Sequence, residues 1–192
     1  MRLMGVLVLR SARENITKGV ICLKYIAVNE LDHFEYHDAE LRKIAWKDTN
    51  LVWELSAVNV TTENTQNNSC KDMCIESAEI MFESCNIESI IFSACGRYDS
   101  NGALIESVEA EIALPEEYDE ILRESLSSYC YIFSMNQYEK TESGKYWACF
   151  TIDGGAGHYD ITISFLKSIV SWDMFSGEAW YEHPQWKNNT RP

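Results

Sequence analysis

The chain has 192 residues, of which 46% are hydrophobic and 24% are charged, a composition that excludes a disordered protein. No run reaches the roughly 20 apolar residues of a membrane-spanning helix, so that class is excluded as well. Sixteen Lys and Arg against thirty Asp and Glu give a formal charge of −14, which disfavours nucleic acid and anionic membranes and suits a basic protein partner, although solubility alone also explains it.

The first thirty residues, 1–30, are either an N-terminal extension or a first strand, because an apolar run at 20–28 follows a basic start. The apolar stretch at the very start, about six residues long, is too short for a signal peptide. Seven cysteines, an odd number in a chain of this length, indicate reduced thiols and a cytoplasmic location. We expect one domain over residues 31–186 and a polar tail over 187–192.

Alternating apolar residues predict a β-hairpin early in the domain. Strand-like segments at 42–46 and 51–60 are separated by turn residues. The polar, asparagine-rich segment 61–71 is predicted to be a loop. Residues 74–82 fit either a helix or a strand, and we favour a strand because an isoleucine-rich run follows.

A second hairpin and one helix come next. Asp-Ser-Asn-Gly at 99–102 favours a tight turn, so we predict a hairpin that joins a strand over 90–98 to one over 103–113. An amphipathic helix is predicted at about residues 115–127, with a proline and acidic residues in its first turn. The residues at helical spacing are Tyr118, Ile121, Leu122, Ser125 and Leu126.

The last third of the chain contains two strand-like runs separated by a glycine cluster at 153–157. Residues 159–166 alternate, which predicts that Tyr159, Ile161, Ile163 and Phe165 share a buried face. Because a strand and not a helix follows the glycines, they predict a hairpin loop rather than a phosphate-binding loop. Together the elements predict a β-rich α+β domain, either an antiparallel sheet or a two-sheet sandwich, with one helix packed on it.

The histidines offer one alternative chemistry. His37, Asp38 and His158 have side chains that zinc binds, and a metal-dependent hydrolase could use them. However, His33 and His37 precede a predicted strand, where four residues span ~13 Å, so the two-histidine helical motif is absent. We interpret the histidines as structural and assign no cofactor.

Six tryptophans offer another alternative, because flat amphipathic rings can line a groove for sugars or peptides. Several are expected in the core. Near the end of the chain Gly177 allows a turn, after which Trp180 and Tyr181 are expected to pack back on the sheet.

Two motifs carry a resemblance. The segments HDAEL at 37–41 and WDMFSGEAWY at 172–181 resemble the opening and closing motifs of small, β-rich bacterial proteins of unassigned function, some of which are grouped with the immunity proteins of toxin systems. The resemblance spans about residues 34–182 and implies a bacterial, cytoplasmic, non-enzymatic protein, with no catalytic residue to transfer. The expected binding residues are His37, Asp38, Trp172, Asp173, Trp180 and Tyr181.

Three functions follow from these observations. The favoured one is a non-catalytic bacterial protein, immunity-like, that binds a basic partner such as a toxin through charge complementarity. It is favoured because the chain has no nucleophile elbow and no recognisable Cys–His signature. The alternatives are the metal-dependent hydrolase and a small-ligand or sugar-binding β domain that uses exposed tryptophans. The oligomeric state does not follow from the sequence.

Overall fold

The computed structural model describes residues 25–183, and antiparallel strands make up most of them. Ten strands form one sheet: β1 (Tyr25–Val28), β3 (Ala39–Lys47), β4 (Asn50–Ser56), β7 (Ala78–Glu83), β8 (Asn86–Phe92), β11 (Glu111–Ile112), β12 (Tyr131–Lys140), β13 (Tyr146–Gly154), β14 (Gly157–Phe165) and β15 (Lys167–Trp172). Their order across the sheet is β1-β15-β7-β4-β3-β12-β13-β14-β8-β11. The predicted β-rich α+β fold is confirmed.

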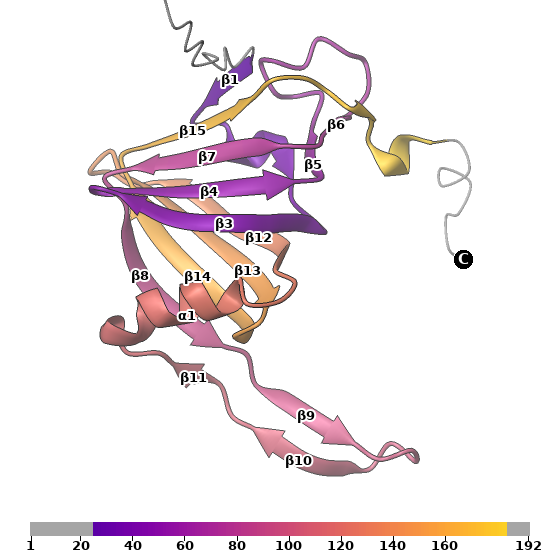
Figure 1. The fold of residues 1–192 in the computed structure, drawn as a ribbon, viewed down its shortest axis with the longest axis vertical. Helices are drawn as coiled ribbons and strands as arrows, with labels where there is room; N and C mark the ends of the chain where they lie inside the picture. The colour runs from indigo at the N-terminus through magenta and orange to yellow at the C-terminus, as the bar shows by residue number, and fades with distance from the viewer. Residues whose placement is uncertain (1–24, 184–192) are drawn as a thin grey trace, which may run out of the picture.

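The ten-stranded sheet bends between β3 and β12, so that its two halves pack face to face with their strands crossing steeply (Figure 1). The bend occurs because β3 and β12 share only two paired positions, Glu40 with Tyr131 and Ala39 with Ile132. Each strand also has a register shift beside this junction, at Arg42 in β3 and at Phe133 in β12. Such bulges bend a strand and re-aim the side chain of the extra residue.

Aromatic side chains fill the space between the two halves. Trp53 of β4 is fully buried, with its ring centroid 5.2 Å from that of Phe82 and 4.9 Å from that of Phe150 on the facing half. The alternation predicted for β14 is confirmed, because each of its four predicted core residues has an exposed fraction of 0%. These four are Tyr159, Ile161, Ile163 and Phe165.

The predicted helix closes one end of the sandwich. It begins as a 3-10 turn, η2 (Pro115–Glu117), and continues as α1 (Tyr118–Ser125), ending two residues before the predicted boundary. Its buried face includes Tyr118, Ile121 and Leu122, as the spacing predicted. The helix therefore covers the sheet with its apolar stripe.

The glycine cluster forms the predicted hairpin between β13 and β14. Gly155 N donates to Ser125 O at 3.0 Å, which brings the hairpin loop against the end of α1. A Cβ at Gly155 would collide with Ser127 Oγ and Glu124 O, so the close approach requires glycine. The glycines thus hold the helix against the sheet.

A second sheet of four short strands lies beside the sandwich, in the order β16-β6-β5-β2. The predicted strand over 51–60 is interrupted at Ala57, whose φ of 59° turns the chain from β4 of the large sheet into β5 of the small one. The C-terminal segment returns to pair with this sheet and ends in a 3-10 turn. The elements are η1 (Leu31–His33), β2 (Phe34–Glu35), β5 (Val58–Val60), β6 (Met73–Ile75), β16 (Gly177–Glu178) and η3 (Trp180–Glu182).

The second predicted hairpin exists, but its outer half leaves the body of the protein as an arm made of β9 (Cys95–Tyr98) and β10 (Leu104–Val108) (Figure 1). The predicted continuous strands are broken on either side of the arm, so that β8 and β11 stay with the large sheet. Every residue of β9 and β10 is exposed. The arm therefore adds nothing to the core.

Residues 25–28 of the predicted segment 1–30 form the edge strand β1, and residues 1–24 lie outside the described part of the chain. The predicted tail, 187–192, also lies outside it. Between residues 25 and 183 no helix is long and apolar enough to cross a membrane, and Cys70, Cys74, Cys85, Cys95, Cys130 and Cys149 are free thiols.

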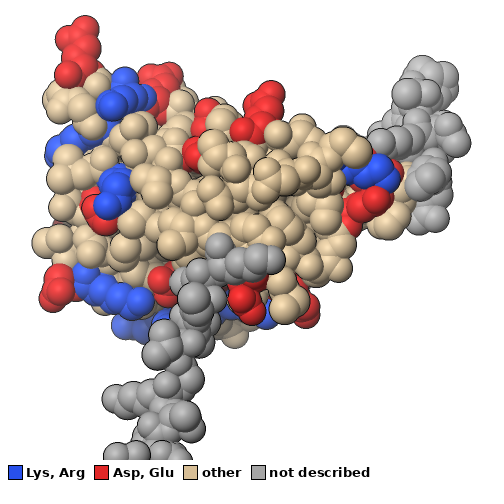
Figure 2. Space-filling model, turned by 90° about the horizontal axis from the view of Figure 1, so that it is seen from above, with Lys and Arg blue, Asp and Glu red and all other residues tan. Residues whose placement is uncertain are grey.

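Charges of both signs lie next to each other on the face seen from above, around a centre without charged side chains (Figure 2). The formal charge of −14 is therefore not expressed as one acidic patch on this face. A surface that selects its ligand by charge is therefore expected at the cavities and not on this face.

Candidate functional site

The candidate site is centred on a cavity of about 650 Å³ beside the small sheet, which we call the aromatic cavity. It combines three aromatic rings with two carboxylates. The rings come from the bulge of β12 and from η3, and the carboxylates from β2 and from the loop before β6. Its lining residues are Glu35, His37, Thr61, Asp72, Phe133, Ser134, Trp180 and Tyr181.

Phe133 enters this cavity because it is the extra residue of the β12 bulge. Its carbonyl oxygen lies 3.0 Å from His37 Nδ1. A carbonyl oxygen can only accept, so His37 carries a hydrogen on Nδ1. The other ring nitrogen, Nε2, lies 3.6 Å from Asp38 Oδ2. The bulge and the histidine therefore fix each other's position.

Asp72 is the most firmly oriented carboxylate of the cavity. Its Oδ2 accepts a hydrogen bond of 3.0 Å from the Tyr181 hydroxyl, and its Oδ1 accepts one of 2.8 Å from Thr62 N. Burial, and then the neighbouring Asp72 carboxylate, raise the pKa of Tyr181, which keeps the phenol protonated as a donor. The carboxylate is thus held in place before any ligand arrives.

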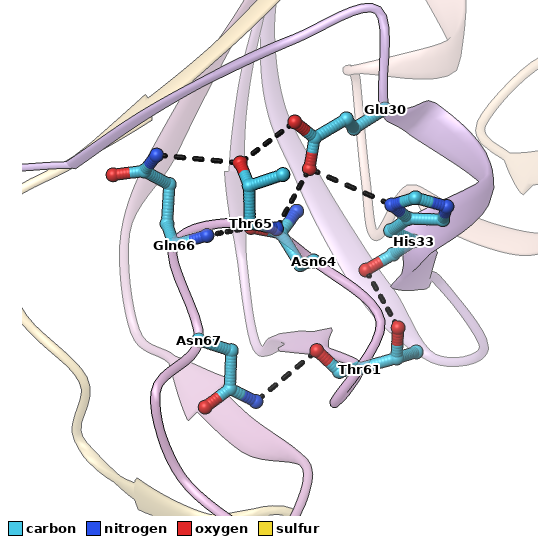
Figure 3. Close-up of polar contacts among 7 residues, drawn as sticks. All are labelled: Glu30, His33, Thr61, Asn64, Thr65, Gln66 and Asn67. Carbon is cyan, nitrogen blue, oxygen red and sulfur yellow. Dashed lines mark hydrogen bonds and ion pairs between the residues drawn. The ribbon is translucent and has the colours of Figure 1, made fainter.

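The asparagine-rich segment predicted as a loop is an ordered support for this wall (Figure 3). The Glu30 carboxylate accepts hydrogen bonds from Thr65 N at 2.9 Å and from Thr65 Oγ1 at 2.7 Å. Asn67 Nδ2 donates to the carbonyl of Thr61, and Thr61 Oγ1 donates to that of His33, both at 3.1 Å. These contacts fasten the loop at its start and middle, and Asn67 Nδ2 also donates to the carbonyl of Lys71, beside Asp72, at 3.0 Å.

Two further cavities continue the site past His37. One of about 320 Å³ has Asp38, Glu40 and Glu76 among its lining residues, and one of about 560 Å³ is lined by Glu76 and Asp173. Arg42 is the one basic residue that lines either of them, and its Nε donates to Glu40 at 3.0 Å. We call the carboxylates of the three cavities the acidic face: Glu35, Asp38, Glu40, Asp72, Glu76 and Asp173.

The structure brings most of the residues expected from the two motifs together. His37, Trp180 and Tyr181 line the aromatic cavity, while Asp38 and Asp173 line its neighbours. The sixth expected binding residue, Trp172, does not line any of these cavities.

Trp172, the exception, is 1% exposed and stacks on Tyr25 with ring centroids 5.3 Å apart. Trp172 is a core residue, out of reach of a partner, because it belongs to β15 and faces the interior.

Among the aromatic rings and carboxylates of the aromatic cavity, sequence reasoning missed three: Glu35, Asp72 and Phe133. Phe133 had a usable pattern, since Tyr129, Tyr131 and Phe133 occupy every second position from just before β12 into it. Exposed aromatic residues at alternate positions suggest a binding surface. The two carboxylates had no comparable pattern, because many acidic residues of this chain occupy loops and strand ends.

The histidines of the hydrolase alternative are placed around an aromatic ring. His37 and His158 each pack edge-on against Phe133, with ring centroids 5.2 and 5.9 Å from that of Phe133. Within residues 25–183, no group of three or more His, Cys, Asp or Glu side chains is arranged to hold a metal ion.

Comparison with protein-family models, with curated proteins and with solved structures gives no match. The site is therefore interpreted from its geometry and charge.

Proposed function

We propose that the protein is a non-catalytic binding protein whose acidic face recognises a basic protein partner. The observation that carries this proposal is the lining of the three cavities, where six carboxylates meet a single guanidinium, that of Arg42. A basic partner gains from such a surface because complementary potentials steer encounter and fix the register of docking.

A bacterial toxin is the partner that the resemblance supports. The two resembling motifs lie more than a hundred residues apart in the sequence, yet His37 of the first and Trp180 and Tyr181 of the second line the same cavity. In this proposal the protein remains in the bacterial cytoplasm and neutralises the toxin by covering its basic surface.

The test is affinity capture from a lysate of the native host, comparing the wild type with the triple variant Asp38→Asn, Glu76→Gln, Asp173→Asn. All three side chains are exposed, so the changes remove charge with little effect on packing. We expect the wild type to retain a basic protein that elutes as salt is raised, because exposed charges are screened within about 10 Å at 0.1 M salt. The triple variant should retain at least tenfold less.

A matched control removes the same charge elsewhere, in the triple variant Glu111→Gln, Glu116→Gln, Glu142→Gln, whose residues are also exposed. It should capture as much as the wild type. Equal capture by all three proteins, or turnover of a substrate by the wild type, would overturn the proposal.

Small-ligand binding is the second candidate, favoured by the size of the aromatic cavity. Its volume of about 650 Å³ lies within the roughly 300–1,000 Å³ of ligand pockets, and its rings could stack on a sugar. Quenching of tryptophan fluorescence by a sugar, lost in Trp180→Ala, would favour this function.

A further inference from the structure

We infer that the aromatic cavity receives the guanidinium group of an arginine side chain presented by the partner. This inference rests on the proposed function and names the chemical group that is recognised.

The walls offer flat apolar surface to a planar cation. Phe133 is 53% exposed and Trp180 is 50% exposed, although both line the cavity. The rings of Trp180 and Tyr181 meet at 80°, with centroids 5.4 Å apart, and form a corner. Aromatic faces attract cations, and guanidinium is planar and weakly hydrated, so it stacks on them more readily than ammonium does.

The carboxylates supply acceptors for the rim of the guanidinium. Asp72 is already oriented by Tyr181 and Thr62, so little orientational freedom is lost on binding. Glu35 is held by His37 N, which donates to its Oε1 at 3.1 Å. Two oriented carboxylates match the five N–H donors of one guanidinium, and they repel anions.

One buried acceptor lies on the same face of the small sheet. Asn59 is directly opposite Glu35 in the pairing of β2 with β5, so the two side chains project from the same face. Asn59 is 2% exposed, and its Oδ1 has no hydrogen-bond partner among the described residues. A buried acceptor without a donor is costly. Asn59 is not among the residues that line the cavity, so it adds to the acceptor character of this face and is not itself a contact of the guanidinium.

The experiment titrates the full-length protein with the peptide acetyl-Gly-Arg-Gly-amide and with its citrulline and lysine counterparts. Citrulline has nearly the shape of arginine but no charge, which isolates the guanidinium charge. Binding is followed by calorimetry and by tryptophan fluorescence. We expect the arginine peptide to bind at least tenfold more tightly than the citrulline peptide and severalfold more tightly than the lysine peptide.

Variants locate the binding. Asp72→Asn and Glu35→Gln should each weaken the arginine peptide at least fivefold, and Trp180→Ala should remove most of the fluorescence change. Glu111→Gln, on β11 and outside the cavity, should have no effect. Circular dichroism of each variant identifies any that fail to fold. In Asp72→Asn the amide oxygen can still accept from Thr62 N, and the amide N–H can donate to the Tyr181 hydroxyl oxygen.

The outcomes separate this inference from the proposed function. Equal binding of the citrulline or lysine peptide, no binding at all, or unchanged affinity in both carboxylate variants overturns the arginine site. If capture of a basic partner still depends on Asp38, Glu76 and Asp173, the proposed function stands without it. Tight arginine binding without such capture supports the site and overturns the protein-partner function alone.

Discussion

At the scale of single residues, Ser164 is an exception to the alternation of β14. Its position is on the face of β14 that is expected to be polar and solvent-exposed, yet it is 1% exposed. Its Oγ donates to Glu88 Oε1 at 2.5 Å, and Asn86 Nδ2 donates to the same oxygen at 3.0 Å. These hydrogen bonds, that of Ser164 first, lower the pKa of Glu88. The carboxylate therefore binds a proton less readily in the folded state than in the unfolded one.

This difference predicts a pH dependence. The stability that Glu88 contributes is present above the ordinary carboxyl pKa of about 4.3 and is lost as pH falls through the lowered folded value. Ser164→Ala should reduce the free energy of unfolding at pH 7 by about 1 kcal/mol, and the further loss between pH 5 and pH 3 should be smaller than in the wild type. Urea unfolding across this range measures both.

Ser100→Ala, at the exposed tip of the arm, is the control and should match the wild type at every pH. A Ser164→Ala variant whose acid profile runs parallel to that of the wild type would contradict the assignment.

The candidate site was partly predictable at this scale. His37, Trp180 and Tyr181 were found because they belong to motifs that can be recognised locally. Phe133 was not, since its place in the cavity depends on a bulge whose position is set by pairing with β13, a tertiary property. Asp72 was not found either, because its orientation depends on Thr62 and on Tyr181, which is more than a hundred residues away in the sequence.

At the scale of elements, Ala57 is the residue at which the chain passes from β4 of the large sheet to β5 of the small sheet. Its φ of 59° is costly for a residue with a Cβ, and its side chain is exposed. Ala57→Gly should therefore raise the free energy of unfolding by about 0.5–1 kcal/mol. Ala45→Gly, in the middle of β3, should lower it by a similar amount, because glycine weakens a strand interior. Chemical denaturation of the pair decides the sign, and destabilisation by both changes would contradict the strain at Ala57.

The predicted elements succeeded where turn chemistry and alternation agreed. The glycines at 153–157 and the proline at the start of the helix gave the right hairpin and the right helix. The runs 51–60 and 103–113 were predicted as continuous strands because nothing in their composition marks a break. Their interruptions come from the change of sheet at Ala57 and from the departure of the arm.

At the scale of the whole molecule, we expect the arm to contribute little to the stability of the fold. Phe92 of β8 pairs with Glu111 of β11 at its base, so a short turn can join the two strands without it. Replacing residues 95–108 with Gly-Gly should leave the melting temperature within about 2 °C of the wild type. The removed residues are exposed, except for the half-buried Asp99, and the loop becomes shorter. Differential scanning calorimetry provides the measurement, and a drop of more than about 5 °C would mean that the arm supports the body.

The fold class was predictable at this scale, but the choice between an open sheet and a sandwich was not. That choice depends on the two paired positions that join β3 to β12 and on the bulges beside them. Strand periodicity is the same on both sides of such a junction, so it carries no information about the bend.

The order in which the chain is synthesised gives the aromatic cavity a further property. Every strand of the ten-stranded sheet precedes β16 and η3, which supply the last wall. A ribosome adding roughly 5–20 residues per second therefore synthesises all ten of these strands before it adds Trp180 and Tyr181. A chain clipped after β15 lacks both rings, so the binding proposed for the aromatic cavity requires a polypeptide that extends through η3.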